Sequence, residues 1–526
     1  MRSIVALAFA LTNSMPCFAQ EVHLAAPAGQ SLFVTLDGKH SRESWDRLKA
    51  DLQVSQSDPV PNLDAEVWHV PTDKVASAFR AVRRRDIAAI DYVGEDYRTL
   101  FLPVSGADLG PTQSRAFQQI SADQALKDIH LVRLRTGDTT SRLLDKTKGT
   151  AEGAGSEAPV VFNVRPGLDV LANRRLASRT ADNSLEWSGS GTSLADSATN
   201  VPGSTAAADP AATSAPAGLP DGTVNLIVTG DRITGSVEVG TETFSIIPLS
   251  GGLHAIAKVD QTTFPAEHPS VRQTSETNDA MPLENVARDL SSSATADASA
   301  SGPLTIGVAY TRQALDSLRA ARPGTTIEAL AALAIAHTNS GFANSDIRGS
   351  VALAGTTELS GTEIADFDTM TDAVVAQGDN RFDDVHAWRR RVRADAVIVF
   401  VAMDAYCGNA AGIHVNAAHS FALVNWRCAW ENSSFPHELG HLLGARHDPD
   451  TDPEDKPFAY AHGFRNGNYW RTIMAYAGGE CTTCPRINRW ANPNQTLDGM
   501  PLGTSARNYD AKLISEMLPV YARNLP

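Results

Sequence analysis

Residues 434–448 read S-F-P-H-E-L-G-H-L-L-G-A-R-H-D, and this stretch decides how the carboxy-terminal half of the chain folds. An N-cap oxygen from Ser433 or Ser434, the proline Pro436 in the first turn and a stripe of leucines predict a short helix. The glycine Gly444 has no Cβ, so it predicts a left-handed turn that ends this helix.

Three histidines in this stretch have the spacing of metal ligands. His437 and His441 are about one helical turn apart, so both imidazoles leave the same face and can bind one ion. The turn after the helix lets His447 return as a third nitrogen ligand. Three protein ligands leave one tetrahedral position open, which indicates a catalytic Zn²⁺ site, and Glu438 lies beside it to accept a proton from water.

The competing interpretation is three surface histidines near a core helix. H-E-x-x-H alone arises by chance on amphipathic helices. With Gly444 and His447 at their fixed offsets, a chance match is close to excluded.

The same residues carry a resemblance. H-E-x-x-H-x-x-G-x-x-H-D, followed by Met474 in R-T-I-M-A-Y, resembles the metzincin zinc metallopeptidases with their Met-turn. Asp448 after the third histidine is similar to the reprolysin-like branch. The later run T-I-M-A-Y…C-x-x-C-P-R-I…N-P resembles the bacterial peptidyl-Asp metalloendopeptidases. The resemblance covers residues 303–526 and implies an α/β (α+β) catalytic domain with a twisted mixed sheet.

The resemblance also implies roles for single residues. Glu438 is the general base, and Met474 lies beneath the histidines as an apolar floor and not as a ligand. Asp448 hydrogen-bonds to the backbone of the Met-turn. Tyr476 occupies the position of a tyrosine that binds the metal or the oxyanion in astacin-like and serralysin-like relatives; packing in the core is an equal alternative.

Specificity is expected downstream of Met474, where metzincins form the wall of the pocket for the residue after the cleaved bond. This wall contains Arg486 and Arg489. A buried arginine binds a carboxylate in a fork, which predicts a preference for Asp at the first primed position. The alternative is that both arginines face water.

Composition excludes several classes of partner. The formal charge is −15 and the pI about 5.4, so neither a nucleic acid nor an anionic membrane surface is expected as a partner. Residues 1–19 combine Arg2, a short apolar run and small residues, which predicts a signal peptide and a secreted protein, extracellular or periplasmic.

The cysteine number suggests disulfides in an exported domain. Of five cysteines, Cys17 leaves with the signal peptide, and the other four lie in the carboxy-terminal half. Three connectivities are possible, of which we favour Cys407 with Cys428 and Cys481 with Cys484.

Composition and patterning divide the rest of the chain. We expect a small α+β propeptide-like domain at 20–140, a low-complexity linker at 141–220, a β-rich prodomain unit at 221–266, a processing region at 267–302 and the peptidase domain at 303–526. Expected strands are 31–36, 65–70, 87–93, 304–310, 349–355 and 396–402, and expected helices are 43–52, 74–84, 326–340, 382–393 and 505–523.

Four further histidines, His337, His414, His419 and His462, are interpreted as surface or loop residues in preference to extra ligands. Arg389 to Arg393 is interpreted as a solvated helix face. The run 408–426 is interpreted as an edge strand and its partner; in the metzincin pattern this edge pairs with the main chain of protein or peptide substrates.

Two functions follow as hypotheses. The first is a secreted zinc endopeptidase made as a zymogen, with its own amino-terminal pro-region as inhibitor. Residues 20–406 contain no cysteine, so latency cannot use one; Asp260 and Glu267 are candidate carboxylates for it. The second is a binding or adhesion factor with an inert peptidase fold, against which the presence of Glu438 speaks.

Overall fold

The computed structural model describes residues 5–6, 21–22, 30–35, 42–59, 65–71, 74, 90–92, 98–104, 109–134, 143, 160–165, 168–180, 183–193, 222–268 and 302–522. The chain forms two compact units. The first contains residues 1–102, 134–177 and 189–222, and the second contains residues 103–133, 178–188 and 223–526. The predicted signal peptide and the helix expected at 74–84 fall almost entirely outside the described residues.

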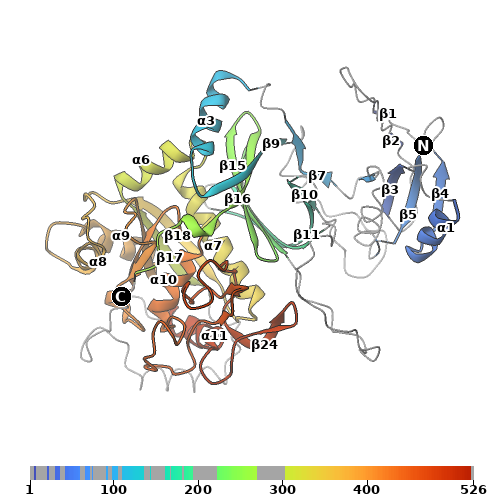
Figure 1. Cartoon of the computed structure of the whole chain (residues 1–526). Helices are drawn as coiled ribbons and strands as arrows, with labels where there is room; N and C mark the ends of the chain where they lie inside the picture. Colours follow the sequence, from blue (N-terminus) through green and yellow to red (C-terminus); the bar gives the residue numbers. More distant parts are fainter. Residues whose placement is uncertain are drawn as a thin grey trace. The chain divides into compact units, whose positions relative to one another are not determined.

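The first unit contains a four-stranded sheet in the order β4 (Gln56–Pro59), β5 (Ala65–Val70), β3 (Gln30–Thr35) and β6 (Ile90–Tyr92), shown in blue in Figure 1. Its pairings are antiparallel. The helix α1 (Arg42–Asp51) buries Trp45 and Leu48. The three strands and the helix expected from sequence here are confirmed.

Three strands lie within the stretch expected to be a linker. They are β10 (Val160–Arg165), β11 (Leu168–Arg179) and β12 (Leu185–Ser193), and β10 pairs antiparallel with β11. The strand β7 (Arg98–Thr99) pairs parallel with β10. Alternating apolar residues such as Phe162 and Val164, both fully buried, outweigh the small-residue composition that predicted a linker. Residues 160–165, 168–179 and 185–193 are therefore strands.

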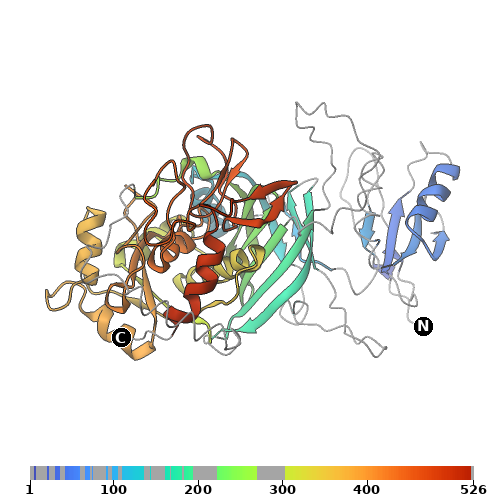
Figure 2. The same cartoon turned by 90° about the horizontal axis from the view of Figure 1, so that it is seen from below.

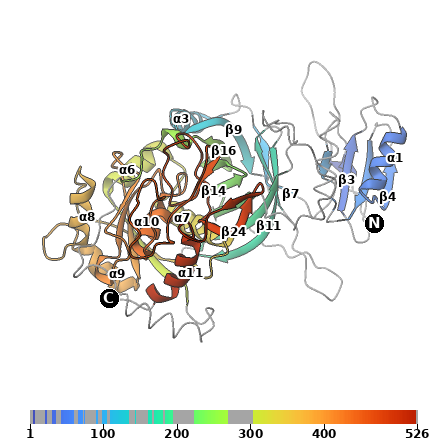
Figure 3. The same ribbon diagram turned by 60° about the horizontal axis from the view of Figure 1, so that its bottom comes forward.

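The second unit begins with a β-rich part. Its antiparallel strands run in the order β13 (Gly222–Thr229), β14 (Arg232–Val239), β15 (Glu242–Ser250), β16 (Leu253–Val259) and β9 (Leu126–Leu134). The helix α3 (Pro111–Ser121) packs against β15, and Figure 3 shows it beside β9. β8 (Phe101–Pro103) precedes it. Because β9 pairs with β16, the domain boundary predicted at residue 140 is wrong: residues 103–133 belong with the β-rich part.

A five-stranded sheet organises the peptidase part. Its order is β18 (Val351–Glu358), β17 (Leu304–Tyr310), β19 (Ala396–Val401), β21 (Phe421–Asn425) and β20 (Gly408–Ala410). The first four strands are parallel, and the edge strand β20 is antiparallel to β21. This confirms the mixed sheet and the predicted edge strand.

Helices cover both faces of this sheet because its strands are apolar on both sides. Val397 and Val399 pack with α8 (Phe367–Val375) and α9 (Asp384–Val392), whereas Ile398 and Phe400 share a core with α7 (Ile327–Asn344) and α10 (Ser434–Leu443). Figure 1 shows α8 and α9 on one side of the sheet and α7 on the other. Mixed α and β structure is thus confirmed.

The remaining elements close the peptidase part. The predicted carboxy-terminal helix is α11 (Asp510–Tyr521), the red helix of Figure 2, and it packs on α10 with Leu513, Ile514 and Met517 buried. The other elements of the second unit are α6 (Arg312–Ala321), η3 (Gln261–Thr263), η5 (Ala417–His419), and the hairpins β22 (Arg465–Asn466) with β23 (Trp470–Arg471) and β24 (Asn492–Leu497) with β25 (Met500–Leu502). The short pair β1 (Val5–Ala6) with β2 (Glu21–Val22) belongs to the first unit.

The favoured cysteine pairs are both bonded. Cys407 joins Cys428 with 5.5 Å between Cα atoms, and Cys481 joins Cys484. The first disulfide ties the residue before β20 to the turn before α10, so it holds the sheet edge beside the helix. Among the described helices, none has the length and apolar character needed to cross a membrane.

Candidate active site

Helix α10 positions the central residues, although its start differs from the prediction. Ser433 is the N-cap with φ 55° and makes no side-chain cap bond. Its hydroxyl instead contacts His337 Nε2 at 3.0 Å, and the Ser434 hydroxyl donates to Glu267 at 2.6 Å. The expected cap oxygens are therefore used by tertiary contacts. Gly444 ends the helix with φ 113°, which confirms the left-handed turn.

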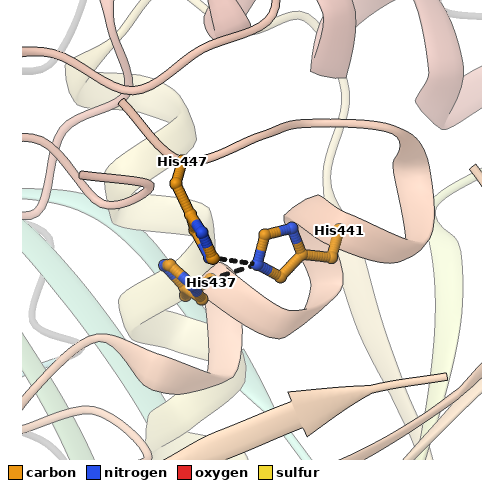
Figure 4. A group of neighbouring side chains, drawn as sticks. All are labelled: His437, His441 and His447. Carbon is orange, nitrogen blue, oxygen red and sulfur yellow. Dashed lines mark hydrogen bonds between the residues drawn. The ribbon is translucent and has the colours of Figure 1, made fainter. Parts of the chain in front are cut away.

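The three predicted histidines converge (Figure 4). His441 Nε2 lies 3.1 Å from His437 Nε2 and 2.9 Å from His447 Nε2. All three residues are buried, and one ring nitrogen of each lies within 4.8 Å of the others. The side chains therefore form one group that could hold a metal ion.

The hydrogen bonds of the rings fit this role. His437 Nδ1 donates to the carbonyl of Ile473, and His441 Nδ1 donates to that of Ala445, each at 2.9 Å. A neutral imidazole that donates through Nδ1 has its lone pair on Nε2. Two lone pairs 3.1 Å apart repel each other unless a cation lies near both, so the donor set fits a zinc ion.

Burial keeps these rings neutral. It lowers the pKa of His441 to about 4 and the pKa values of His437 and His447 well below the usual value for histidine, with the neighbouring imidazoles adding to the effect for the last two. Neutral imidazoles are the form that binds a metal.

Glu438 lies on the same helix, beside the edge strand. It is 2% exposed and accepts a hydrogen bond from the backbone of Ala410. A Cβ at Gly408 would lie 2.4 Å from Glu438 Oε1, so the edge strand needs a glycine there. Burial first, and then the carboxylate of Glu267, raise the pKa of Glu438 well above its usual value. The positive charge of a bound metal would lower the pKa of Glu438.

The Met-turn has the predicted contacts. A Cβ at Gly440 would meet Met474 Sδ at 2.6 Å, so the methionine packs directly beneath α10. The backbone N–H of Tyr476 donates to Asp448 Oδ2 at 3.0 Å. The ring centroid of Tyr476 lies 4.0 Å from that of His447, and its hydroxyl donates to the carbonyl of His268 at 2.5 Å.

The two wall arginines are both buried, at 3% and 7% exposure, so the water-facing alternative is wrong. They differ in what they contact. Arg489 donates to the carbonyl of Asn344 at the end of α7, and so supports the core. Arg486 forms a buried ion pair with Glu267 at 2.5 Å.

The other histidines lie outside the triad. His337, His414 and His462 are 2% exposed or less, so the expectation that they lie at the surface is wrong for these three. Each has a structural contact: His337 with Ser433, His414 with the carbonyl of His441 through its backbone N–H, and His462 with the carbonyl of His447 through its ring. His419 is partly exposed and contacts Asn416. Among the described residues, the candidate metal group consists of His437, His441 and His447.

One feature of this region is not predicted by the sequence. Residues 266–268 lie next to β20 and the wall, because His268 donates to the carbonyl of Gly408 and Glu267 pairs with Arg486. Its charge alone makes Glu267 a candidate for the carboxylate that keeps the enzyme latent. Its ion pair with Arg486 joins residues 219 positions apart. The other candidate, Asp260, caps the turn η3 by accepting from Thr262 and stays outside the site.

Comparison with known proteins agrees with this geometry. Residues 305–491 match the family described as Reprolysin_5, metallo-peptidase family M12. Three similar proteins are named "Peptidyl-Asp metalloendopeptidase". One, from Xanthomonas campestris pv. campestris, is 37% identical over 53% of this chain and 64% of its own. Two from strains of Stenotrophomonas maltophilia are 35% and 36% identical over 56% and 55% of this chain and 69% and 67% of theirs.

The chain thus spans a little under two thirds of the length of the Xanthomonas relative. One solved structure, titled "Structure of a chaperone-substrate complex", aligns with a TM-score of 0.33 at 15% identity over 56% of this chain and 40% of the other, which is too low to indicate a shared fold. From the sequence matches, this chain belongs to metallo-peptidase family M12.

Proposed function

We propose that the protein is a zinc-dependent endopeptidase. The observation that carries this proposal is the convergence of three neutral imidazoles beside a buried glutamate and a sheet edge. His437, His441 and His447 would hold the metal through their Nε2 atoms. A zinc ion in this place would lower the pKa of a water molecule to about 7 and polarise a peptide carbonyl.

The chain's own residues would then handle protons and orientation. Glu438 accepts the proton of the attacking water and delivers it to the departing amine. The Tyr476 hydroxyl, now bonded to His268, becomes free when that segment leaves and can donate to the carbonyl oxygen under attack. Asp448 keeps Tyr476 in position through the backbone bond.

Substrate main chain would bind along β20, the antiparallel edge of the sheet. An edge strand offers unpaired backbone donors and acceptors, so recognition there depends little on side chains. Specificity would come from the wall. The buried Arg486 and the name of the relatives both favour an acidic residue, and we infer a preference for Asp at the first primed position.

We further propose that the protein is secreted, and that it is made as a zymogen whose amino-terminal region blocks the site. The short apolar run at residues 4–11 supports the first proposal, and the contacts of residues 266–268 with Gly408, Tyr476 and Arg486 support the second.

Casein digestion tests the proposed activity. Chelation of the metal and Glu438→Ala should each abolish cleavage, because removal of a general base costs about 10²- to 10⁴-fold in rate. Glu480→Ala, at an exposed carboxylate, should cleave like wild type. Hydrolysis that continues after chelation would rule out the zinc mechanism, and absence of hydrolysis in every form of the chain would favour the binding-factor alternative.

Digestion of a peptide library tests the proposed specificity. We expect Asp to be enriched at the residue after the cleaved bond. A library cut with no enrichment at that position would refute the preference while leaving the peptidase activity in place.

A further inference from the structure

A short segment of the chain, residues 266–268, contacts the edge strand and the wall of the candidate site. The backbone N–H of Cys407 donates to the carbonyl of Ala266 at 2.9 Å, and the N–H of His268 donates to the carbonyl of Gly408 at 3.3 Å. Tyr476 adds the side-chain bond to His268. The segment therefore uses the edge-strand groups and the tyrosine that a substrate would need.

Glu267 is the residue of this segment that turns inward. Ala266 is exposed, whereas Glu267 is 3% exposed. Its Oε1 atom accepts from Arg486 at 2.5 Å, from the Ser434 hydroxyl at 2.6 Å and from Asn432 Nδ2 at 3.2 Å. Three donors on one carboxylate oxygen form a site built for an anion.

The surroundings of Arg486 fix the guanidinium in place. It donates to the carbonyls of Asn432 at 2.8 Å and Ala475 at 3.3 Å, and the second of these belongs to the Met-turn. A buried arginine without an anion nearby strongly destabilises the folded chain. When Glu267 leaves, the pocket must therefore take up another carboxylate or admit water, and this requirement discriminates against neutral side chains.

We propose that Arg486, Ser434 and Asn432 form a subsite for a side-chain carboxylate of the substrate, and that Glu267 fills this subsite in the uncleaved chain. The substrate part of this assignment rests on the proposed peptidase function. The part that places Glu267 in the subsite concerns the folded chain itself, so it can be tested by peptide binding without any hydrolysis.

The backbone of the segment explains why Glu267 would block the subsite and why the bond before it would not be cleaved. If Glu267 lay as a substrate residue, the bond before it, whose carbonyl belongs to Ala266, would be the one cleaved. That carbonyl accepts from the N–H of Cys407, the residue just before the edge strand β20. The carboxylate therefore fills the specificity pocket while the adjacent carbonyl is held by the sheet edge.

Peptide binding to full-length chains tests the assignment. All chains contain Glu438→Ala, so no turnover occurs. The probe is a labelled hexapeptide with a central Asp, and its twin has Asn; binding is measured by fluorescence polarisation. The chain with Glu267→Ala should bind the Asp peptide at least tenfold more tightly than does the chain that retains Glu267. The same Glu267→Ala chain should bind the Asp peptide at least tenfold more tightly than the Asn peptide.

Two controls make the result specific. Asp260→Ala removes a carboxylate seven residues away that only caps a turn, and it should bind the probe as weakly as the parent chain. Adding Arg486→Gln to Glu267→Ala should erase the difference between the Asp and Asn peptides. Where Glu267→Ala does not fold by circular dichroism, the isosteric Glu267→Gln replaces it.

The inference is wrong if the Glu267→Ala chain binds both peptides equally, or if the chain with Glu267 binds the probe as tightly as the variant does. A separate measurement uses chains with Glu438 intact, in which Glu267→Gln should raise hydrolysis by the uncleaved chain at least tenfold. Loss of chelator-sensitive hydrolysis in all forms, with the peptide discrimination preserved, would refute the peptidase function and leave the carboxylate subsite standing.

Discussion

At the scale of single residues, the site depends on how the chain leaves α10. Gly444 turns with φ 113°, and the next residue, Ala445, accepts the bond that orients His441. His447 follows three residues after the turn. The direction of the chain at one glycine therefore sets the positions of two of the three imidazoles.

Gly444→Ala should weaken both fold and metal binding. The left-handed φ is strained for any residue with a Cβ, and the new atom would lie 3.1 Å from the ring of Phe458. We expect a loss of at least about 1 kcal/mol in the free energy of unfolding in urea, together with faster zinc loss to a chelator. Gly302→Ala, where a Cβ meets nothing within 4 Å, should change neither quantity. An unchanged Gly444→Ala protein would show that the turn does not set the site.

The metal ligands and Glu438 could be predicted because their signal is local. Four side chains within eleven residues have their geometry fixed by one helix and one turn. The pairing of Glu267 with Arg486 could not be predicted in this way. It depends on how the chain returns over 219 residues, and nothing in the pattern near either residue specifies the partner of the other.

At the scale of elements, strands and helices with strong apolar patterns were predicted within a few residues. Strand β17 was predicted with its observed bounds, and α7 begins one residue after its predicted start. The short helices α6 and α8 were missed. Arg389 was misread as solvated: it is buried and donates to three backbone carbonyls, which a charge pattern alone does not reveal.

A buried histidine makes the β-rich part sensitive to acid. His254 in β16 accepts from the N–H of Ile233 at 2.9 Å, and burial lowers its pKa to about 4. Its pKa in the unfolded chain is about 6.5. The folded state thus resists protonation of His254. The contribution of the neutral ring to the free energy of unfolding is therefore complete above pH 6.5 and is lost as the pH falls from 6.5 to about 4.

His254→Gln keeps an acceptor for Ile233 and removes the titration. Between pH 7 and pH 4, wild type should lose about 3 kcal/mol more stability than this variant, from 1.36 kcal/mol per pKa unit. Urea unfolding of both full-length chains at several pH values measures this difference. Parallel pH curves for the two proteins would refute a role for His254.

At the scale of the molecule's second unit, the β-rich and peptidase parts share one core. Ile247 and Leu249 of β15 belong to the same apolar cluster as α7 and α10. A Cβ at Gly324 would lie 1.8 Å from the carbonyl of Pro248, so the two parts are in close contact there. The parts are also joined by ion pairs: Asp123 contacts Arg322 at 2.5 Å and also Arg427.

Asp123→Asn should destabilise the uncleaved chain as a whole. The change leaves Arg322, 4% exposed, with only the more distant Glu431 at 3.7 Å as an acidic partner among the described residues. We expect the free energy of unfolding to fall by about 3 kcal/mol, the lower end for breaking a buried ion pair. Asp128→Asn, on the exposed side of β9, should change it by less than about 0.5 kcal/mol. Equal effects of the two variants would mean that the Asp123 ion pair contributes little.

X-ray absorption at the zinc edge of the purified full-length chain shows whether the three histidines hold a zinc ion. We expect one zinc per chain, with three nitrogen ligands at about 2.0–2.1 Å, and loss of this signal in a chain with His441→Ala. A chain that binds no zinc, or that binds it with the same spectrum after His441→Ala, would show that these histidines do not form a zinc site.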